Sequence, residues 1–329
     1  MALPPDIASQ LVLPAIGAPM FLCSGVELAA ETCKAGLIGS LTSNHCSDPA
    51  ALDAQLAAVG ERIAAHRAAA PLARIGPLAV NVSLHHGATQ TAAYLDACHR
   101  HGVRIVITSV GDPRKMVERV HAWSGLVFHD CTSVRHAHKA IAAGVDGIIA
   151  IGAGGGGHSG AVSHLTLVPQ IRSLFDGVIV MAGAVGTGAA IRAAQVLGAD
   201  LAYLGTRLIA TQESLAPQAY KDMLVEGEAA DVVYTAAVNG VPANWLVASM
   251  RRNGLDPASL AVPARRGTDH LPAGVKPWKT LWSAGQGIGL IHDIPRVATL
   301  VERLRAEYRA ACAIPATADA GGLAGQVQP

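Results

Sequence analysis

One unit recurs along about the first 210 residues of the chain: an alanine-rich helical stretch, a glycine and then a short β-branched run. The glycines at these junctions suit the left-handed backbone conformation that often follows a helix, and they are Gly36, Gly102, Gly144 and Gly198. Each run that follows is apolar on both faces, which is typical of parallel strands buried between two layers. The pattern therefore predicts an α/β fold built on a parallel sheet.

Eight such runs occur in one continuous series, and all but the last are closely followed by a helical stretch. They are PAIGAPM (14–20), KAGLIGSL (34–41), PLAVNV (77–82), RHGVRIVITS (100–109), GLVFHD (125–130), AAGVDGIIAI (142–151), FDGVIVMAG (175–183) and LGADLAYLGT (197–206). Eight βα units in series favour a (β/α)8 TIM barrel over an open doubly wound sheet.

The repeat ends after LGTRLIAT (204–211). Residues 212–280 contain one helical stretch (YKDMLVEGE, 220–228), several prolines and no clear βα unit, so we expect a mostly helical domain that covers the substrate. The missing helix after strand eight is predicted at 294–311, with one apolar face formed by Val297, Leu300, Val301 and Leu304. The predicted barrel thus comprises residues 1–211 and 281–313, with a flexible tail at 314–329.

Charge and cysteine usage exclude several classes of protein. A net charge of +1, with 15% charged residues, gives no general case for binding nucleic acid or an anionic membrane. The six cysteines show no C-x-x-C and no metal-ligand spacing, so we expect reduced thiols and no metal site. There is no signal-peptide pattern and no unbroken apolar stretch of about 20 residues. We therefore expect a soluble cytoplasmic protein.

The loop after the sixth strand reads GAGGGGHSG (152–160) and allows three interpretations. A dinucleotide-binding fingerprint would need an acidic residue at the end of the next strand, whereas Asp176 precedes that strand. A linker does not fit between a buried strand and the next βα unit. The third interpretation is a loop that passes close to a flat ligand and presents His158, its only titratable group. An ordinary surface histidine remains the alternative.

Glycine-rich turns also follow the last two strands, as MAGAVGTG (181–188) and LGTR (204–207). Turns at strands seven and eight form the usual phosphate site of a TIM barrel, because backbone N–H groups face the anion there. The expected donors are Gly183, Ala184, Gly205 and Thr206. Tight turning without a ligand is the alternative.

The ends of the first and third strands carry GAPM (17–20) and Asn81, which fit either a ligand contact or ordinary structure. An amide at such a position can donate and accept at the heteroatom edge of a ring. Motifs of P-loop proteins, zinc peptidases and serine hydrolases (G-x-x-x-x-G-K-[ST], H-E-x-x-H and G-x-S-x-G) are missing from the sequence.

Together, GAPM, the NV of the third strand, GGHSG, MAGA, YLGTR and the late WSAGQG resemble the nitronate monooxygenase family, also called 2-nitropropane dioxygenases. The likeness runs from about residue 10 to 311. GGH-x-G with GTR is also similar to the flavin-dependent enoyl-acyl-carrier-protein reductases. The resemblance implies an FMN-bearing TIM barrel with a smaller helical domain over the flavin, and it makes His158 the catalytic histidine.

The resemblance also implies FMN contacts along most of the chain. Ala18, Pro19 and Met20 would run along the isoalloxazine, and Asn81 would bond its polar edge. Asp130 stands where some members have a lysine, so the positive charge near that part of the flavin is missing. The remaining implied contacts are Gly157, Gly183, Ala184, Gly205, Thr206, Ser283, Ala284, Gly285 and Gln286.

The reaction implied by the resemblance is oxidation of alkyl nitronates, and of nitroalkanes, by O2 to a carbonyl compound and nitrite. Two rivals stay open: an FMN-dependent NAD(P)H:quinone or enoyl-thioester reductase, and a flavin-free barrel that binds a phosphorylated substrate. We expect a small-molecule substrate and O2 as the partners, without nucleic acid or membrane, and a homodimer is one option for the assembly.

Overall fold

A closed barrel of eight parallel strands forms the centre of the computed structural model, which describes residues 2–314. Neighbouring strands follow the order β1-β9-β8-β6-β5-β4-β3-β2, and the bridge between Ile16 and Ile38 joins the two end strands. The strands are β1 (Ala15–Gly17), β2 (Gly39–Thr42), β3 (Leu78–Asn81), β4 (Ile105–Thr108), β5 (Leu126–Cys131), β6 (Gly147–Ile151), β8 (Val178–Ala182) and β9 (Leu201–Leu204). All eight predicted strands and the (β/α)8 fold are confirmed.

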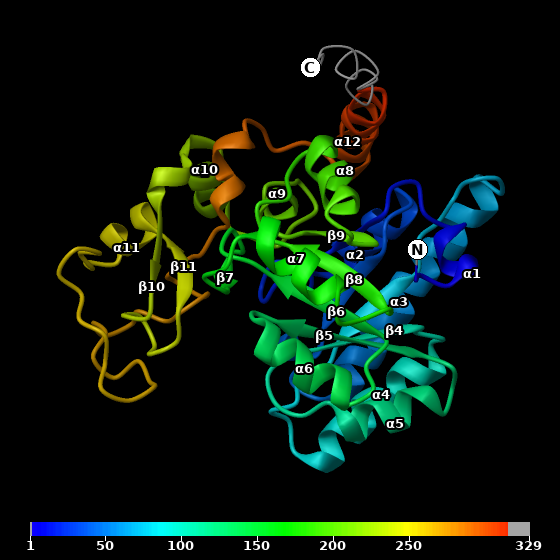
Figure 1. Ribbon diagram of the computed structural model, residues 1–329, viewed down its shortest axis with the longest axis horizontal. Coiled ribbons are helices and arrows are strands. Elements are labelled where there is room, and N and C mark those ends of the chain that lie inside the picture. Colours follow the sequence, from blue (N-terminus) through cyan, green and yellow to red (C-terminus); the bar gives the residue numbers. More distant parts are fainter. Residues whose placement is uncertain (1, 315–329) are drawn as a thin grey trace, which may run out of the picture.

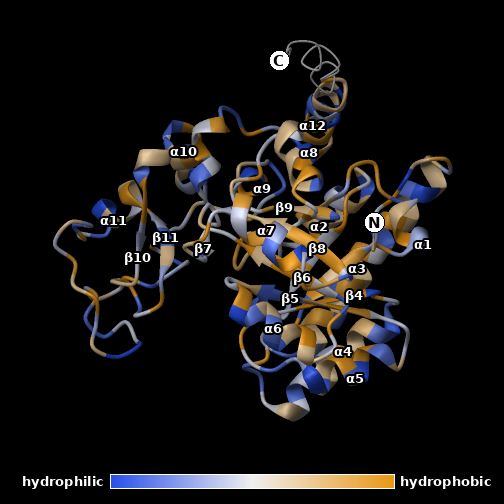
Figure 2. Cartoon of the chain, viewed as in Figure 1, coloured by the Kyte–Doolittle hydropathy of each residue, from blue (hydrophilic) through white to orange (hydrophobic). Residues whose placement is uncertain are grey.

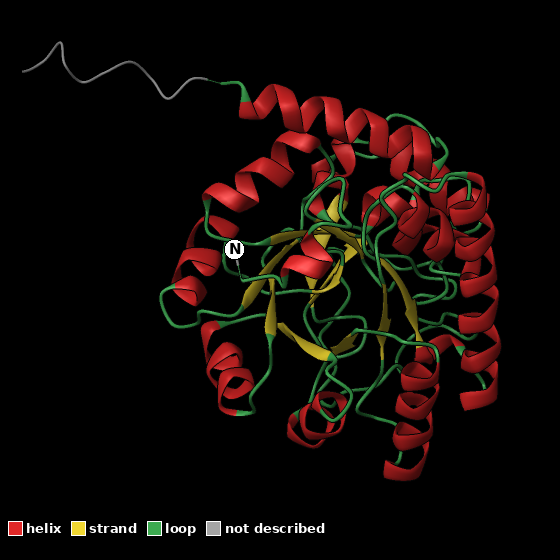
Figure 3. Ribbon diagram, turned by 90° about the vertical axis from the view of Figure 1, so that its right-hand side faces the viewer, coloured by secondary structure: helices red, strands yellow, loops and turns green. Residues whose placement is uncertain are grey.

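Helices surround this barrel on its outer side, as Figure 3 shows in a view along the strands. They are α2 (Val26–Lys34), α3 (Pro49–Ala69), α4 (Ala88–Arg100), α5 (Arg114–His121), α6 (Val134–Ala142), α7 (His164–Arg172), α8 (Gly188–Val196) and α12 (Val297–Cys312). The four junction glycines have φ between +66° and +102°, as the sequence predicts. Helix α12 is the missing eighth helix, and its predicted apolar face is buried against α8 and α2.

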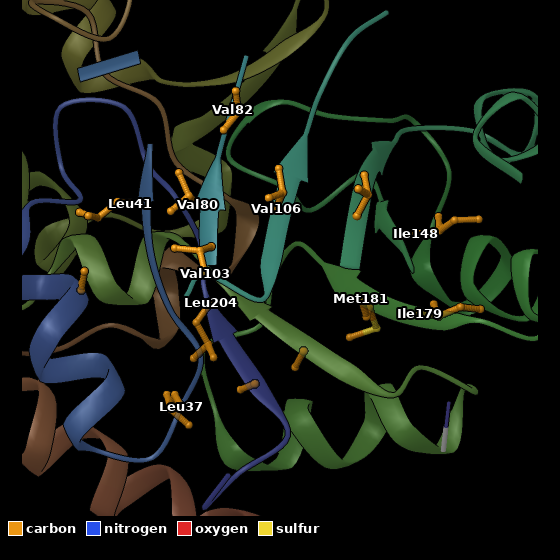
Figure 4. Close-up of a cluster of buried hydrophobic side chains, with 14 of the residues drawn as sticks. Leu37, Leu41, Val80, Val82, Val103, Val106, Ile148, Ile179, Met181 and Leu204 are labelled. Carbon is orange, nitrogen blue, oxygen red and sulfur yellow. The ribbon is translucent and has the colours of Figure 1, made fainter. Parts of the chain in front are cut away.

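Two apolar layers hold the strands, because successive side chains of a strand point to opposite faces. Outward residues such as Val80, Val106, Ile148, Ile179 and Leu204 pack against the helices (Figure 4). Figure 2 shows apolar residues concentrated along the central strands and polar residues on the outer helices.

Inward residues form a separate apolar cluster inside the barrel, which includes Ile107, Phe128 and Ile149. Leu3 and Ile7, on and beside the short helix α1 (Pro5–Ala8), belong to the same cluster. The inward stripes continue toward the carboxyl ends of the strands with polar residues, which are Asn81, Asp130 and Tyr203. The barrel therefore has an apolar interior and a polar floor at the end where TIM barrels carry their sites.

The segment between β9 and α12 lies to one side of the barrel (Figure 1). It contains α9 (Thr206–Ile209), α10 (Gln218–Glu226), α11 (Val247–Arg252) and the 3-10 turns η2 (Ala229–Asp231) and η3 (Gln286–Leu290). Another 3-10 turn, η1 (Ser43–His45), follows β2. The helix predicted at 220–228 corresponds to α10, whereas the domain limits of 212 and 280 stay a prediction.

A small sheet in this segment is a feature that the sequence did not predict. Strands β10 (Val232–Thr235) and β11 (Ala243–Leu246) form an antiparallel hairpin. Strand β11 also pairs with β7 (Gly157–His158), which lies in the glycine-rich loop after β6. The insert and the loop that carries His158 are thus joined through backbone pairing.

The predicted tail at 314–329 lies outside the described residues beyond residue 314. Within residues 2–314, no helix is long and apolar enough to cross a membrane.

The buried His129 on the outward face of β5 makes stability depend on pH. Its Nδ1 lies 2.6 Å from the Thr108 hydroxyl, and burial lowers the pKa of His129 to about 4. The folded-state pKa lies below the ordinary value, so the stabilisation is present above about pH 6.5 and is lost as pH falls toward 4. Between pH 6.5 and 5 we expect His129 to remove roughly 2 kcal/mol of unfolding free energy.

Thermal midpoints at pH 7 and pH 5 measure this effect in the wild type and in His129→Asn. The variant keeps an acceptor for Thr108 but has no titrating ring, so its midpoint is expected to fall less between the two pH values. An equal fall in both proteins would contradict the assignment.

Candidate active site

A cavity of about 630 Å³ opens at the carboxyl ends of the barrel strands, beneath the inserted segment. Its walls come from the segment after β1, the loop after β6, the turns after β8 and β9, and the insert. The cavity brings together the following predicted site residues: Ala18, Pro19, Met20, Asn81, Asp130, Gly157, His158, Gly183, Ala184, Gly205, Thr206, Ser283 and Gly285.

Two predicted residues do not line this cavity. Ala284 is fully buried in an apolar cluster with Tyr220 and Trp282. Gln286 has an exposed side chain, and its backbone N–H donates to the Gly154 carbonyl at 3.1 Å. The WSAGQG segment therefore meets the glycine-rich loop mainly through its backbone.

His158 lies where the loop after β6 meets the insert. Its ring is 5.0 Å from the ring of Trp278 at an interplanar angle of 75°, and Nε2 is 3.3 Å from the Asn239 amide nitrogen. The amide nitrogen can only donate, so Nε2 accepts in this contact and the neutral ring carries its proton on Nδ1. Loss of solvent and the nearby charge of Arg266 both lower the pKa of His158. The imidazole is therefore neutral at neutral pH.

The glycine-rich loop is held in place by Asn244 of β11. Its amide nitrogen lies 2.8 Å from the Ala153 carbonyl and 2.6 Å from the Gly155 carbonyl, to which it donates. Glycine is needed at Gly156 because a Cβ there would lie 2.9 Å from the backbone nitrogen of Gly285. The loop is thus a fixed wall of the cavity, packed closely against the backbone of the insert.

The turns after β8 and β9 present backbone N–H groups to the cavity. Within residues 2–314, those of Gly183, Gly186, Gly205 and Thr206 have no protein acceptor. The N–H of Ala184, which the sequence placed in this set, instead donates to the Gly154 carbonyl at 3.1 Å. Unpaired backbone donors of this kind suit an anion, and we refer to the two turns as the anion cradle.

Thr206 adds a side-chain hydroxyl to this turn, and a hydrogen bond from Gly285 leaves that hydroxyl to act as a donor. The Gly285 N–H donates to Thr206 Oγ1 at 2.9 Å, so the hydroxyl proton is free for another acceptor. The next residue, Arg207, is buried and its Nη2 lies 2.9 Å from Asp293 Oδ1. This ion pair ties the turn after β9 to the segment before α12.

The first wall, Ala18 to Met20, is shaped by the buried Ser24. The Met20 N–H donates to Ser24 Oγ at 2.8 Å, and Ser24 Oγ donates to the Ala18 carbonyl at 3.0 Å. The turn therefore keeps its shape without a helix.

The floor of the cavity is polar. The Thr42 hydroxyl donates to Asn81 Oδ1 at 3.1 Å, which fixes the orientation of that amide. Asp130 and Tyr203 complete the floor, and burial raises the pKa of the Tyr203 phenol well above 10.

Several residues of the site were not found from the sequence. Tyr203 and Trp278 line the cavity, whereas Asn239 contacts His158 and Asn244 bonds the glycine-rich loop. One signal was available for two of them. Asn239 and Gly240 form an N-G pair between the short runs VVYT and ANWL, which indicates a turn between these runs. No local pattern marks Trp278, because its contact with His158 joins residues far apart in the chain.

A TIM barrel with unpaired N–H groups, a polar floor and a neutral histidine at one open cavity is an enzyme scaffold with a small-molecule site. The model of the nitronate monooxygenase family matches residues 6–307. The chain belongs to this family of oxidoreductases, for which a flavin cofactor is implied.

Individual relatives agree with this placement. A nitronate monooxygenase of Neurospora crassa is 31% identical over 243 residues, which cover 64% of this chain and 64% of that protein. The chain spans between 41% and 64% of the length of the first four curated relatives it matches.

Solved structures cover more of the chain. A nitroalkane oxidase from Streptomyces ansochromogenes has a TM-score of 0.72 at 25% identity, covering 93% of this chain and 98% of that one. FabK from Thermotoga maritima has a TM-score of 0.73 at 23% identity, covering 94% and 97%, and this likeness shows the fold alone.

Proposed function

We propose that the chain binds FMN in its cavity and oxidises alkyl nitronates with O2 to a carbonyl compound and nitrite, with nitroalkanes as a second class of substrate. The observation that carries the proposal is the neutral His158 beside Trp278, opening onto the same cavity as the anion cradle. Family membership supports the flavin and the reaction class.

The residues present suit a flavin mononucleotide. The volume of about 630 Å³ lies within the range of about 300–1,000 Å³ typical of small-molecule and cofactor sites. The unpaired N–H groups of Gly183, Gly186, Gly205 and Thr206 would hold the phosphate. Ala18 to Met20 would flank the ring system, and Asn81 would bond its polar edge. A Cβ on Gly205 would meet nothing nearer than 3.8 Å, so the cradle is open there.

His158 has a different task for each class of substrate. A nitroalkane still carries its acidic α-proton, which the unprotonated Nε2 would accept as a general base, with Asn239 giving up its contact to that nitrogen. A nitronate has already lost the proton, so the imidazole would orient the anion. When bound, FMN would supply the redox chemistry of the reaction.

The purified protein is expected to be yellow, with absorbance in the flavin bands and about one FMN released per chain on denaturation. Oxygen consumption with alkyl nitronates then tests the reaction, with the same assay lacking substrate as the control. A colourless protein that cannot be reconstituted with FMN would contradict the proposal. That result would favour the flavin-free barrel that binds a phosphorylated substrate.

Anaerobic mixing with NADH or NADPH separates the monooxygenase from the reductase. Under the proposed function the flavin absorbance stays unchanged on the timescale of turnover, whereas rapid bleaching would identify a reductase. The homodimer and the cytoplasmic location stay predictions from the sequence.

A further inference from the structure

Asp130 occupies an unusual position on the floor of the cavity. It lies near the end of β5 on the same face as Phe128, so it continues a stripe of inward side chains. Its Oδ1 is buried and has no hydrogen-bond partner within residues 2–314, although the residue lines the cavity. Burying a charged carboxylate oxygen without a hydrogen-bond donor costs free energy. The neutral carboxylic acid pays a smaller desolvation penalty at the same position.

The neighbours of Asp130 supply no compensating cation. Its partner in β6 is the apolar Ile149, and Ser109 lines the cavity after β4. The titratable groups around it are Cys131 on its own strand and Tyr203 on β9, and neither carries positive charge. His158 is neutral, as argued above.

Among the lining residues of the described chain, the guanidinium is that of Arg207, which forms an ion pair with Asp293. No ion pair to Asp130 forms in the described part of the chain. In keeping with this setting, burial raises the pKa of Asp130 to about 7.

We propose that Asp130 binds the cofactor as a neutral carboxylic acid, donating a hydrogen bond to an acceptor of the ring system, so that FMN binding takes up a proton above neutral pH. The inference rests on the proposed function. A ring laid over the floor removes the remaining water from Asp130, which penalises the carboxylate further. Only the protonated acid can donate to a ring acceptor. Where some family members have a lysine, this chain would therefore offer a donor without a charge.

Titration of the apoprotein with FMN, followed by quenching of flavin fluorescence between pH 6.5 and 9, tests the inference. Above the pKa of the free acid, the Kd of the wild type is expected to rise about tenfold per pH unit. The second pKa of the FMN phosphate is about 6, which is below this pH range. Ionisation of the phosphate therefore changes the Kd of all variants equally. Asp130→Asn keeps a donor but has no proton to lose, so its Kd should stay nearly flat. Asp112→Asn, at an exposed acid, is the matched control and should keep the wild-type slope.

Calorimetry on the wild type alone gives a second measurement that needs no variant. Near pH 8, binding in two buffers of different ionisation enthalpy should show uptake of close to one proton per FMN. Bound flavin without proton uptake, or equal pH slopes for the wild type and Asp130→Asn, would overturn the inference and leave the proposed function intact. A wild-type protein that binds no FMN at any pH would overturn both.

Discussion

Replacing His158 by asparagine is expected to lower kcat/KM for a nitroalkane by about 100- to 1,000-fold, while nitronate oxidation falls by less than about tenfold. Only the nitroalkane needs a base, and an amide cannot accept the α-proton at neutral pH. The pairing of the loop with β11 uses backbone atoms, so the variant should keep its fold and its flavin.

The pH profile gives a second readout of the same assignment. Loss of solvent and the charge of Arg266 lower the pKa of His158, so the neutral base persists below the ordinary histidine value of about 6.5. Nitroalkane turnover should therefore fall only on the acidic side of that value, and this limb should vanish in His158→Asn. His138→Asn, an exposed histidine on α6, is the control and should match the wild type. Equal losses on both substrates would rule out the role of base.

Filling the anion cradle is expected to have the other large effect. In Gly205→Val, the new Cβ would meet Ala18 and Met20 at 3.8 Å, an ordinary contact, while the extra methyl groups would crowd the cradle. A displaced phosphate loses charge-assisted hydrogen bonds worth about 1.5–3 kcal/mol each. Losing two of them predicts a Kd for FMN at least about 100-fold higher.

Flavin content after purification and the Kd from fluorescence titration measure this change. Gly60→Val on the exposed face of α3 is the matched control, since nothing lies within 4 Å of a Cβ at that glycine. The control should keep full flavin content, and thermal midpoints should show that both variants fold. Wild-type flavin affinity in Gly205→Val would place the phosphate elsewhere.

The strands and helices of the barrel were predictable because each is encoded locally. A helix, a glycine such as Gly102 with positive φ and a short apolar run form a pattern of adjacent residues. The face of α12 that contains Leu300 follows from helical periodicity in the same way.

The small sheet was not predicted because its third strand is only two residues long and comes from another part of the chain. Gly157 pairs with Asn244, and no local preference marks Gly157 as a strand residue. The sequence therefore predicted a separate loop that presents His158. In the structure this loop bonds β11 on one side and packs against Gly285 on the other.

The loops that line the cavity could be predicted from the sequence, because the strand order of a barrel places them at one end, whereas Ala284 and Gln286 do not line it. The chemistry of the lining residues was not accessible. The neutral state of His158 depends on Arg266 and on lost solvent, and the raised pKa of Asp130 depends on burial without a donor.

The sequence by itself thus determined the fold class and the end of the barrel that carries the site, since periodicity and glycine placement act over a few residues. Only the tertiary structure decided in which direction the pKa values of His158 and Asp130 shift and which N–H groups remain free, since the Ala184 N–H donates to Gly154. Burial, charge and hydrogen-bond partners arise from residues distant in sequence, and these contacts exist only once the chain has folded.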